Sequence, residues 1–307
     1  MIKRWLSLFL KGMAMGAADV VPGVSGGTVA FITGIYEELL ESIAKVNVAN
    51  LKLLFSQGPK AFWQAINGNF FLVLIAGIAS SFVLFSSLIL HVIAVYPLLV
   101  WGFFFGLVIA SAIYLFKTLT THNWKTLLAL VLGVMVAYLT TLHVNLALSP
   151  TPINFFVGGA IAICAMILPG ISGSYLLLLM GLYLPVLTAI KSFDISLVGL
   201  FLLGAGLGIL LFSRVLNWLL HRFHEITLAT LVGFLIGSLN VIWPWKEVIS
   251  WRESSSGAMK PLIQENILPM QYTQITGNDP QILGVAVACL VGLSLIFVLE
   301  KTLSRKE

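Results

Sequence analysis

The order of apolar and polar residues divides the chain into long apolar runs separated by short polar segments. Six runs are long and apolar enough to cross a hydrocarbon core of ~30 Å as single helices. They span residues 70–94, 98–116, 126–148, 195–213, 226–243 and 282–299. Two further apolar regions, 5–43 and 153–190, are each interrupted by residues that break helices, VPGVSGG in the first and LPGISGS in the second.

The two interruptions are copies of one another. Segments 21–43 and 168–190 align without gaps, and eight of their 23 positions are identical. The identical pairs include Pro22/Pro169, Gly23/Gly170, Ser25/Ser172, Gly26/Gly173, Gly34/Gly181 and Tyr36/Tyr183. Because three of the long runs follow each copy, the chain is predicted to consist of two repeats of about 150 residues. Each repeat contains one broken element and three spans.

Composition narrows the class of protein. The chain is 59% hydrophobic and 9% charged, against ~25% charged residues in soluble domains, which excludes a soluble enzyme. The net charge of +5 reports topology in a membrane protein rather than binding to nucleic acid. The two cysteines, Cys164 and Cys289, lie in apolar runs and indicate neither a disulfide nor a metal site. The predicted fold class is an all-α polytopic membrane protein.

Basic residues predict the orientation of these spans. If each broken element is a re-entrant hairpin that enters and leaves on one side, 13 of the 17 Lys and Arg residues lie in the cytoplasm. Both termini are then cytoplasmic, and the four outer basic residues are Lys191, Lys246, Arg252 and Lys260. An odd number of spans separates the two hairpins, so they enter from opposite faces. The halves are therefore predicted to be inverted repeats whose turns approach each other near the midplane.

The predicted domains follow from the repeat. The first repeat, 1–148, has a re-entrant hairpin at 5–43, an interfacial helix at 45–69 on the inner leaflet, and three spans. Aromatic residues among lysines, such as Phe55 and Trp63 beside Lys52 and Lys60, predict the interfacial helix. The second repeat, 149–307, has a re-entrant hairpin at 153–190, three spans and a polar outer segment at 244–281. In WPWKEVISWRE the tryptophans stand next to charges, as in membrane-interface anchors.

The interrupted segments carry the candidate binding chemistry. Non-helical backbone at membrane depth is tolerated only where it is buried in protein or lines a watery cavity, and broken helices in inverted repeats indicate the substrate site of a transporter. Glycine lets a ligand approach the backbone, and the helix starts supply free N–H groups and a positive dipole end. An anionic head group such as phosphate is therefore the expected ligand. The turn-forming residues are Pro22, Gly23, Pro169 and Gly170, and the candidate substrate-binding residues are Ser25, Gly26, Gly27, Thr28, Ser172, Gly173 and Ser174.

Asp19 is the one carboxylate placed within an apolar run, and Met166 stands at the matching position of the second copy. Intramembrane acids usually have a function. Asp19 is a candidate for coupling to an ion, and its alternative role is to hydrogen-bond the free amides of its own turn. No cofactor and no metal is expected. The sequence leaves the coupling ion, proton or sodium, undetermined, together with the oligomeric state.

Three other interpretations compete with a transport site. Glycines also serve close helix packing in membranes, which fits the scattered glycines of GLGIL and GFLIGS but explains neither the prolines nor the repeat. A secondary transporter of a small soluble anion would use the same hairpins with a closed, watery path. SRVLNWLLH, residues 213–221, resembles the serine-arginine…histidine element of membrane lipid phosphatases, but the spacing is one residue too long and the partner motifs are absent.

The two motifs together resemble the paired signatures of a known family. GAADVVPGVSGGTVAFITGIYE and ILPGISGSYLLLLMGLY are similar to those of the polyprenyl-phosphate transporters, bacterial and archaeal membrane proteins. This resemblance, which covers nearly the whole chain, implies transport of undecaprenyl phosphate across the cytoplasmic membrane. It implies return of the carrier lipid from the outer to the inner leaflet for cell-envelope synthesis. The outer segment 246–280 has no counterpart in the resemblance.

Overall fold

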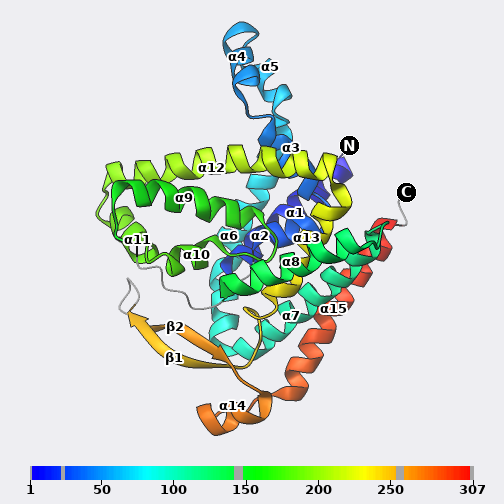
Figure 1. Ribbon diagram of the computed structural model, residues 1–307, viewed down its shortest axis with the longest axis vertical. Helices are drawn as coiled ribbons and strands as arrows, with labels where there is room; N and C mark the ends of the chain where they lie inside the picture. The colour runs from blue at the N-terminus through cyan, green and yellow to red at the C-terminus, as the bar shows by residue number, and fades with distance from the viewer. Residues whose placement is uncertain (1, 22–24, 142–147, 254–258, 305–307) are drawn as a thin grey trace.

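The computed structural model describes residues 2–21, 25–141, 148–253 and 259–304, and most of these residues are helical (Figure 1). The chain begins with the long helix α1 (Ile2–Val20), the short α2 (Gly26–Ile32) and α3 (Tyr36–Ala44). Two more short helices follow, α4 (Val48–Ser56) and α5 (Pro59–Ala65). Three long helices, α6 (Gly68–Val95), α7 (Pro97–Thr118) and α8 (Trp124–Thr141), complete the first half.

The second half repeats this order without counterparts of α4 and α5 and with additions near its end. It contains α9 (Pro152–Ile167), α10 (Gly173–Leu179), α11 (Tyr183–Lys191), α12 (Ile195–Arg222) and α13 (His224–Ser238). An antiparallel pair of strands, β1 (Lys246–Glu253) and β2 (Met259–Asn266), comes next. The helices α14 (Pro269–Thr276) and α15 (Ile282–Ser304) end the described chain.

The bounds of the helices follow the sequence repeat. The helices α2 and α10 have seven residues each, and α3 and α11 have nine each. Between the members of each pair stand Gly34 and Gly181, whose φ angles are +71° and +74°. Glycine adopts this left-handed conformation without steric cost, which explains why the repeat keeps glycine at both positions. The pair α10–α11 bends by 106° at this break.

The long helices pack in pairs, some within one half of the chain and some between the halves. Within one half, α1 packs along α6, and α9 packs along α12. Between the halves, α8 packs along α13, and α7 packs along α15. In all four pairs, glycines bring the two backbones so close that an added Cβ would meet a carbonyl of the partner helix, as at Gly77, Gly106, Gly133 and Gly204. The predicted packing role of the glycines in GFLIGS is thus confirmed, since Gly233 and Gly237 lie against α8.

Gly204 and Gly206, which lie two residues apart and therefore on opposite faces of α12, provide a test of this packing. A Cβ at Gly204 would meet the backbone of Phe156 on α9, whereas one at Gly206 would meet nothing within 4 Å. We expect Gly204→Ala to lower the thermal midpoint of the purified protein, since forced overpacking costs about 1–3 kcal/mol. Gly206→Ala is expected to leave it unchanged or to raise it, because alanine is favoured over glycine in a helix by about 0.5–1 kcal/mol. Equal midpoints for the two variants would contradict the α9–α12 contact.

Four helices in the described part of the chain are long and apolar enough to cross a membrane: α6, α7, α8 and α12. They correspond to four of the six predicted spans. The other two predicted spans, 226–243 and 282–299, coincide with α13 and α15, but α13 has only 15 residues. It ends at Ser238 and the chain continues as turns to Pro244. Residues 142–147, at the end of the predicted span 126–148, lie outside the described residues.

The outer segment differs from the all-α prediction, because β1 and β2 form a two-stranded sheet there. Trp243 and Trp245 connect the start of this segment to its end. Their indole N–H groups donate to the carbonyls of Ile267 and Pro280 at 2.9 and 2.8 Å. The amine of Lys246 lies 4.9 Å above the ring of Trp101 on α7, and burial lowers the pKa of Lys246 to about 8.

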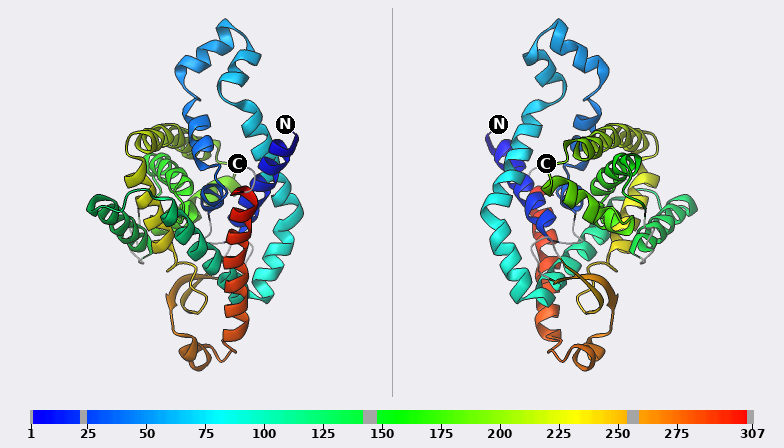
Figure 2. Two further views of the ribbon diagram at one scale, coloured as in Figure 1. Left: turned by 90° about the vertical axis from the view of Figure 1, so that its right-hand side faces the viewer. Right: turned by 90° about the vertical axis from the view of Figure 1, so that its left-hand side faces the viewer.

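The predicted single interfacial helix at 45–69 is instead two short helices, α4 and α5. Asn47 caps α4, and the break between the helices is at Gln57 and Gly58, where Gly58 has a φ of +87°. Proline at the first position of α5 starts a new helix there. Both views in Figure 2 show α4 and α5 standing clear of the packed helices.

Candidate functional site

The first interrupted segment is organised around the start of α2. Ser25 caps this helix, since its hydroxyl accepts a hydrogen bond from the N–H of Gly27 at 3.2 Å. The carboxylate of Asp19, at the end of α1, accepts from the N–H of Gly26 at 2.6 Å. A carboxylate at a helix start compensates both the free N–H group and the positive dipole end. Asp19 thus forms the hydrogen bond to an amide of its own turn that was predicted as its alternative role.

The second interrupted segment lies between α9 and α10 and is organised differently. Pro169 is fully buried, and Gly170 has a φ of +82° with its Cα against the carbonyl of Phe234 and the hydroxyl of Ser238. Ser172 stands at the cap position of α10 but makes no cap hydrogen bond. Its hydroxyl lies 3.0 Å from that of Ser174, which is exposed.

Two hydrogen bonds join the segments directly. The hydroxyl of Ser25 donates to the carbonyl of Met166 at 2.9 Å, and the N–H of Gly170 donates to the hydroxyl of Thr28 at 2.9 Å. Between these bonds, Gly27 lies against the end of α9. A Cβ at Gly27 would be 2.6 Å from the carbonyl oxygen of Met166 and 2.7 Å from that of Ile167. The structure thus brings together two segments that lie about 140 residues apart.

The predicted binding residues divide into two groups. Ser25, Gly26, Gly27 and Thr28 are buried, and both hydroxyls are engaged within the protein. In the second copy, Gly173 is buried beneath Ser172 and Ser174, whose hydroxyl pair is accessible. The turn residues Pro22 and Gly23 lie outside the described residues. Sequence reasoning did not identify Met166 and Ser238 as contacts of the turns. A backbone carbonyl such as that of Met166 leaves no signal in the sequence.

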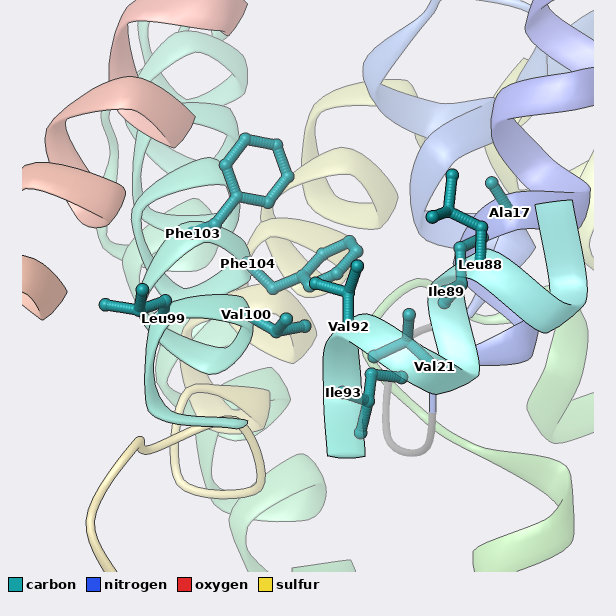
Figure 3. Close-up of a pocket in the computed structure, with 10 residues that line it drawn as sticks. All are labelled: Ala17, Val21, Leu88, Ile89, Val92, Ile93, Leu99, Val100, Phe103 and Phe104. Atoms are coloured by element: carbon teal, nitrogen blue, oxygen red, sulfur yellow. The ribbon is translucent and has the colours of Figure 1, made fainter. Parts of the chain in front are cut away.

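An apolar pocket of about 450 Å³ begins beside the first segment (Figure 3). Its walls come from the end of α1, the C-terminal part of α6 and the first turns of α7. Val21, which directly precedes the undescribed residues 22–24, forms part of the wall. All ten lining residues are apolar: Ala17, Val21, Leu88, Ile89, Val92, Ile93, Leu99, Val100, Phe103 and Phe104. Such a lining suits a hydrocarbon chain rather than a hydrated ion.

The residues that resemble a lipid phosphatase element have structural contacts. The hydroxyl of Ser213 is buried and donates to the carbonyl of Leu210 on its own helix. Arg214 donates to the carbonyl of Val46 at 3.0 Å, and Nδ1 of His221 lies 2.8 Å from the carbonyl of Asn217. The three side chains thus contact three different partners and do not converge on one point. Among the described residues, no group of three or more His, Cys, Asp or Glu side chains is placed to hold a metal ion.

The long apolar helices and the facing helix breaks define a helical integral membrane protein with its candidate site between the two breaks. The chain belongs to the undecaprenyl phosphate translocase-like family, whose model matches residues 15–260. The family resemblance predicted from the two motifs is thereby confirmed.

Two curated relatives support the family assignment. The chain is 47% identical over 298 residues to the polyprenyl-phosphate transporter of Vibrio cholerae, with 97% of each chain covered. It is 33% identical over 259 residues to the polyprenyl-phosphate transporter of Staphylococcus aureus, which covers 78% of this chain and 87% of that relative. No solved structure matches.

Proposed function

We propose that this protein transports a polyprenyl phosphate, namely undecaprenyl phosphate, across the cytoplasmic membrane from the outer to the inner leaflet. This step returns the carrier lipid for cell-envelope synthesis. The single observation that carries the proposal is the paired interruption of two helices beside a wholly apolar pocket. Such a site offers polar groups for a phosphate and an apolar surface for its tail. The names of both relatives support the same substrate class.

The proposed topology follows the distribution of basic residues. The broken elements are re-entrant hairpins in two inverted repeats, and both termini lie in the cytoplasm. The equal lengths of α2 and α10, of α3 and α11, and of α6 and α12 support the repeat. Polar backbone within the membrane is then shielded because each turn packs against the other half of the protein.

The proposed mechanism is alternating access, in which one half moves against the other. The two turns differ in a way that fits one state of such a cycle. The first turn is closed, since Asp19 and Ser25 take the first N–H groups of α2. The second turn presents the Ser172 and Ser174 hydroxyls, so we place the phosphate there in this state. The buried residues Ser25, Gly26, Gly27 and Thr28 form the seam that parts when the site opens to the other leaflet.

Asp19 is the proposed coupling residue. In the closed turn its carboxylate is bound to Gly26, so parting of the seam frees it to bind a proton or a cation. A ligand shifts such an equilibrium only by its different affinity for the two states. Release of the carboxylate from Gly26 supplies a difference of this kind. Transport measured under separate proton and sodium gradients identifies which of the two ions is used.

The proposal is tested by leaflet exchange of undecaprenyl phosphate in proteoliposomes. We expect the wild-type protein to accelerate exchange over protein-free vesicles, with or without an imposed proton or sodium gradient. The variant Ser172→Ala/Ser174→Ala is expected to lower the rate about tenfold or more, since loss of hydrogen bonds to a charged group costs about 1.5–3 kcal/mol. Its thermal midpoint should stay close to that of the wild type, because Ser174 is exposed and Ser172 caps nothing.

The matched control is Ser80→Ala on α6, whose hydroxyl bonds only to the carbonyl of Ala76 in its own helix. It should exchange lipid at the wild-type rate. No acceleration by the wild type under any gradient would overturn the lipid substrate. Uptake of inorganic phosphate by the same vesicles would then point to a small soluble anion. Full activity of the double serine variant would be compatible with the lipid substrate but would contradict the assignment of the second turn as its phosphate site.

A further inference from the structure

The pair α4–α5 is an addition to the first repeat that the second repeat lacks. In the first half, α3 ends at Ala44 and α6 begins at Gly68, whereas in the second half α11 ends at Lys191 and α12 begins at Ile195. The flanking helices match in length across the two halves. A repeat can therefore form its helices without this insertion. A pair of helices kept in one half only must have a purpose other than completing the fold.

The exposed surface of α4 carries large apolar side chains. Val48, Leu51 and Phe55 are exposed by 69%, 47% and 84%. They are spaced i, i+3 and i+7, so they form one stripe along one face of the helix. Neither α4 nor α5 has a buried residue. An apolar stripe that faces away from the protein is stable only if another apolar phase covers it.

The charges of the insertion identify the kind of surface that covers this stripe. Lys45, Lys52 and Lys60 are all exposed, and the sequence has no acidic residue between Glu41 and Asp194. Lys52 lies on the same face of α4 as the apolar stripe. Long lysine stems lie along apolar surface while their amines reach charged groups. Apolar side chains beside lysines, with no acid among them, complement the head groups and upper acyl chains of an anionic leaflet.

The position of the insertion fits that leaflet. It emerges between the end of α3 and the start of α6. Basic residues from other helices lie at the base of the insertion, where Arg4 pairs with Glu38 at 2.7 Å and Arg214 donates to the carbonyl of Val46. In Figure 1, both chain termini and the end of α12 lie toward the same upper right side of the molecule, opposite the β1–β2 sheet. The insertion leaves the body above α3 and projects upward from it in Figure 1, away from the β1–β2 sheet.

We propose that α4–α5 docks onto anionic phospholipid of the inner leaflet, with the Val48–Leu51–Phe55 stripe in the acyl region and Lys45, Lys52 and Lys60 at the head-group phosphates. This docking holds the segment between α3 and α6 at the membrane surface. It does not depend on which substrate the protein carries. Since α3 follows α2 in the chain and packs against α12, docking of the insertion fixes the position of the chain next to the helices that move in the proposed mechanism.

The test measures the depth of a nitroxide label on the full-length protein in nanodiscs. Cys164 and Cys289 are first replaced by alanine, and single cysteines are then introduced by Phe55→Cys or by Ala49→Cys. Ala49 is exposed on the same helix but points about 100–160° away from the three residues of the stripe. Discs of phosphatidylcholine with phosphatidylglycerol are compared with discs of phosphatidylcholine alone.

In the discs with phosphatidylglycerol, the label at 55 is expected to be reached by oxygen and shielded from a water-soluble nickel chelate, and the label at 49 to show the reverse. In phosphatidylcholine alone, or with Lys45→Gln/Lys52→Gln/Lys60→Gln, nickel access at 55 should rise at least twofold. Unchanged thermal midpoints would show that these variants fold. Equal nickel access at 55 in both lipids overturns the proposal. A label at 55 that neither reagent reaches indicates that protein, such as a second copy, covers the stripe, and this also overturns it.

Discussion

Replacing Gly27 by valine is expected to abolish most of the transport activity. The reason is the contact with α9, because a Cβ at this position would lie 2.6 and 2.7 Å from the carbonyl oxygens of Met166 and Ile167. Both are backbone atoms at the end of a helix, so neither can rotate away as a side chain would. Overpacking of this kind costs about 1–3 kcal/mol. If the cost falls on the closed state alone, about 1.4 kcal/mol already changes its population tenfold.

The measurement is the exchange rate of undecaprenyl phosphate in proteoliposomes, together with the thermal midpoint of the purified variant. Gly199→Val on α12 is the matched control, since a Cβ there would meet nothing within 4 Å. We expect it to transport at close to the wild-type rate. A Gly27→Val protein that matches the wild type in both measurements would show that the two turns do not need this contact.

Asp19 is expected to give the second large effect, and two substitutions separate its two roles. Asp19→Ala leaves the N–H of Gly26 without the acceptor that it has at 2.6 Å. Loss of such a partner costs about 1–3 kcal/mol, so the thermal midpoint should fall. Asp19→Asn keeps a carbonyl oxygen that accepts the same hydrogen bond, and it should unfold close to the wild-type temperature. Because it carries no charge, we expect it to lose the response of transport to a proton or sodium gradient.

Transport is measured with each gradient imposed separately, and the ion whose gradient stimulates the wild type is the coupling ion. Met166 occupies the position of Asp19 in the second repeat, and Met166→Leu keeps its backbone carbonyl and its size. This control variant should keep the gradient response. An Asp19→Asn protein that is as stable as the wild type and equally responsive would make Asp19 a helix cap only.

The sequence was sufficient for the class, the family and the existence of the two facing turns. Long apolar runs predict spans because a helix that crosses ~30 Å of hydrocarbon needs about 20 apolar residues. The paired motif also predicted that a helix starts after each turn, as α2 and α10 do. These features depend on local composition and on spacing along the chain, both of which a single sequence contains.

The division of roles between the two turns was not predictable from the same motif. Ser25 and Ser172 occupy equivalent positions, yet one is buried against Met166 and the other lies beside an exposed hydroxyl. The difference arises from residues outside the motif, such as the end of α9 against Gly27 and Ser238 against Gly170. Contacts of this kind join segments that are far apart in sequence, and they involve backbone carbonyls that every residue type has. The strands β1 and β2 were missed because their charges and tryptophans were interpreted as an interfacial segment.

Because α7 and α8 of the first half pack against α15 and α13 of the second half, the protein cannot complete its helix packing until the second half is made. When the ribosome has completed α7 and α8, their packing partners α15 and α13 have not yet been synthesised. The faces of α7 and α8 that carry Gly106 and Gly133 therefore contact lipid or the insertion machinery until the last helix enters the bilayer. Maturation is then governed by the final residues rather than by completion of the first half. A ribosome that stalls after α12 would release a chain with both of these faces uncovered, which is a substrate for membrane quality control rather than half a transporter.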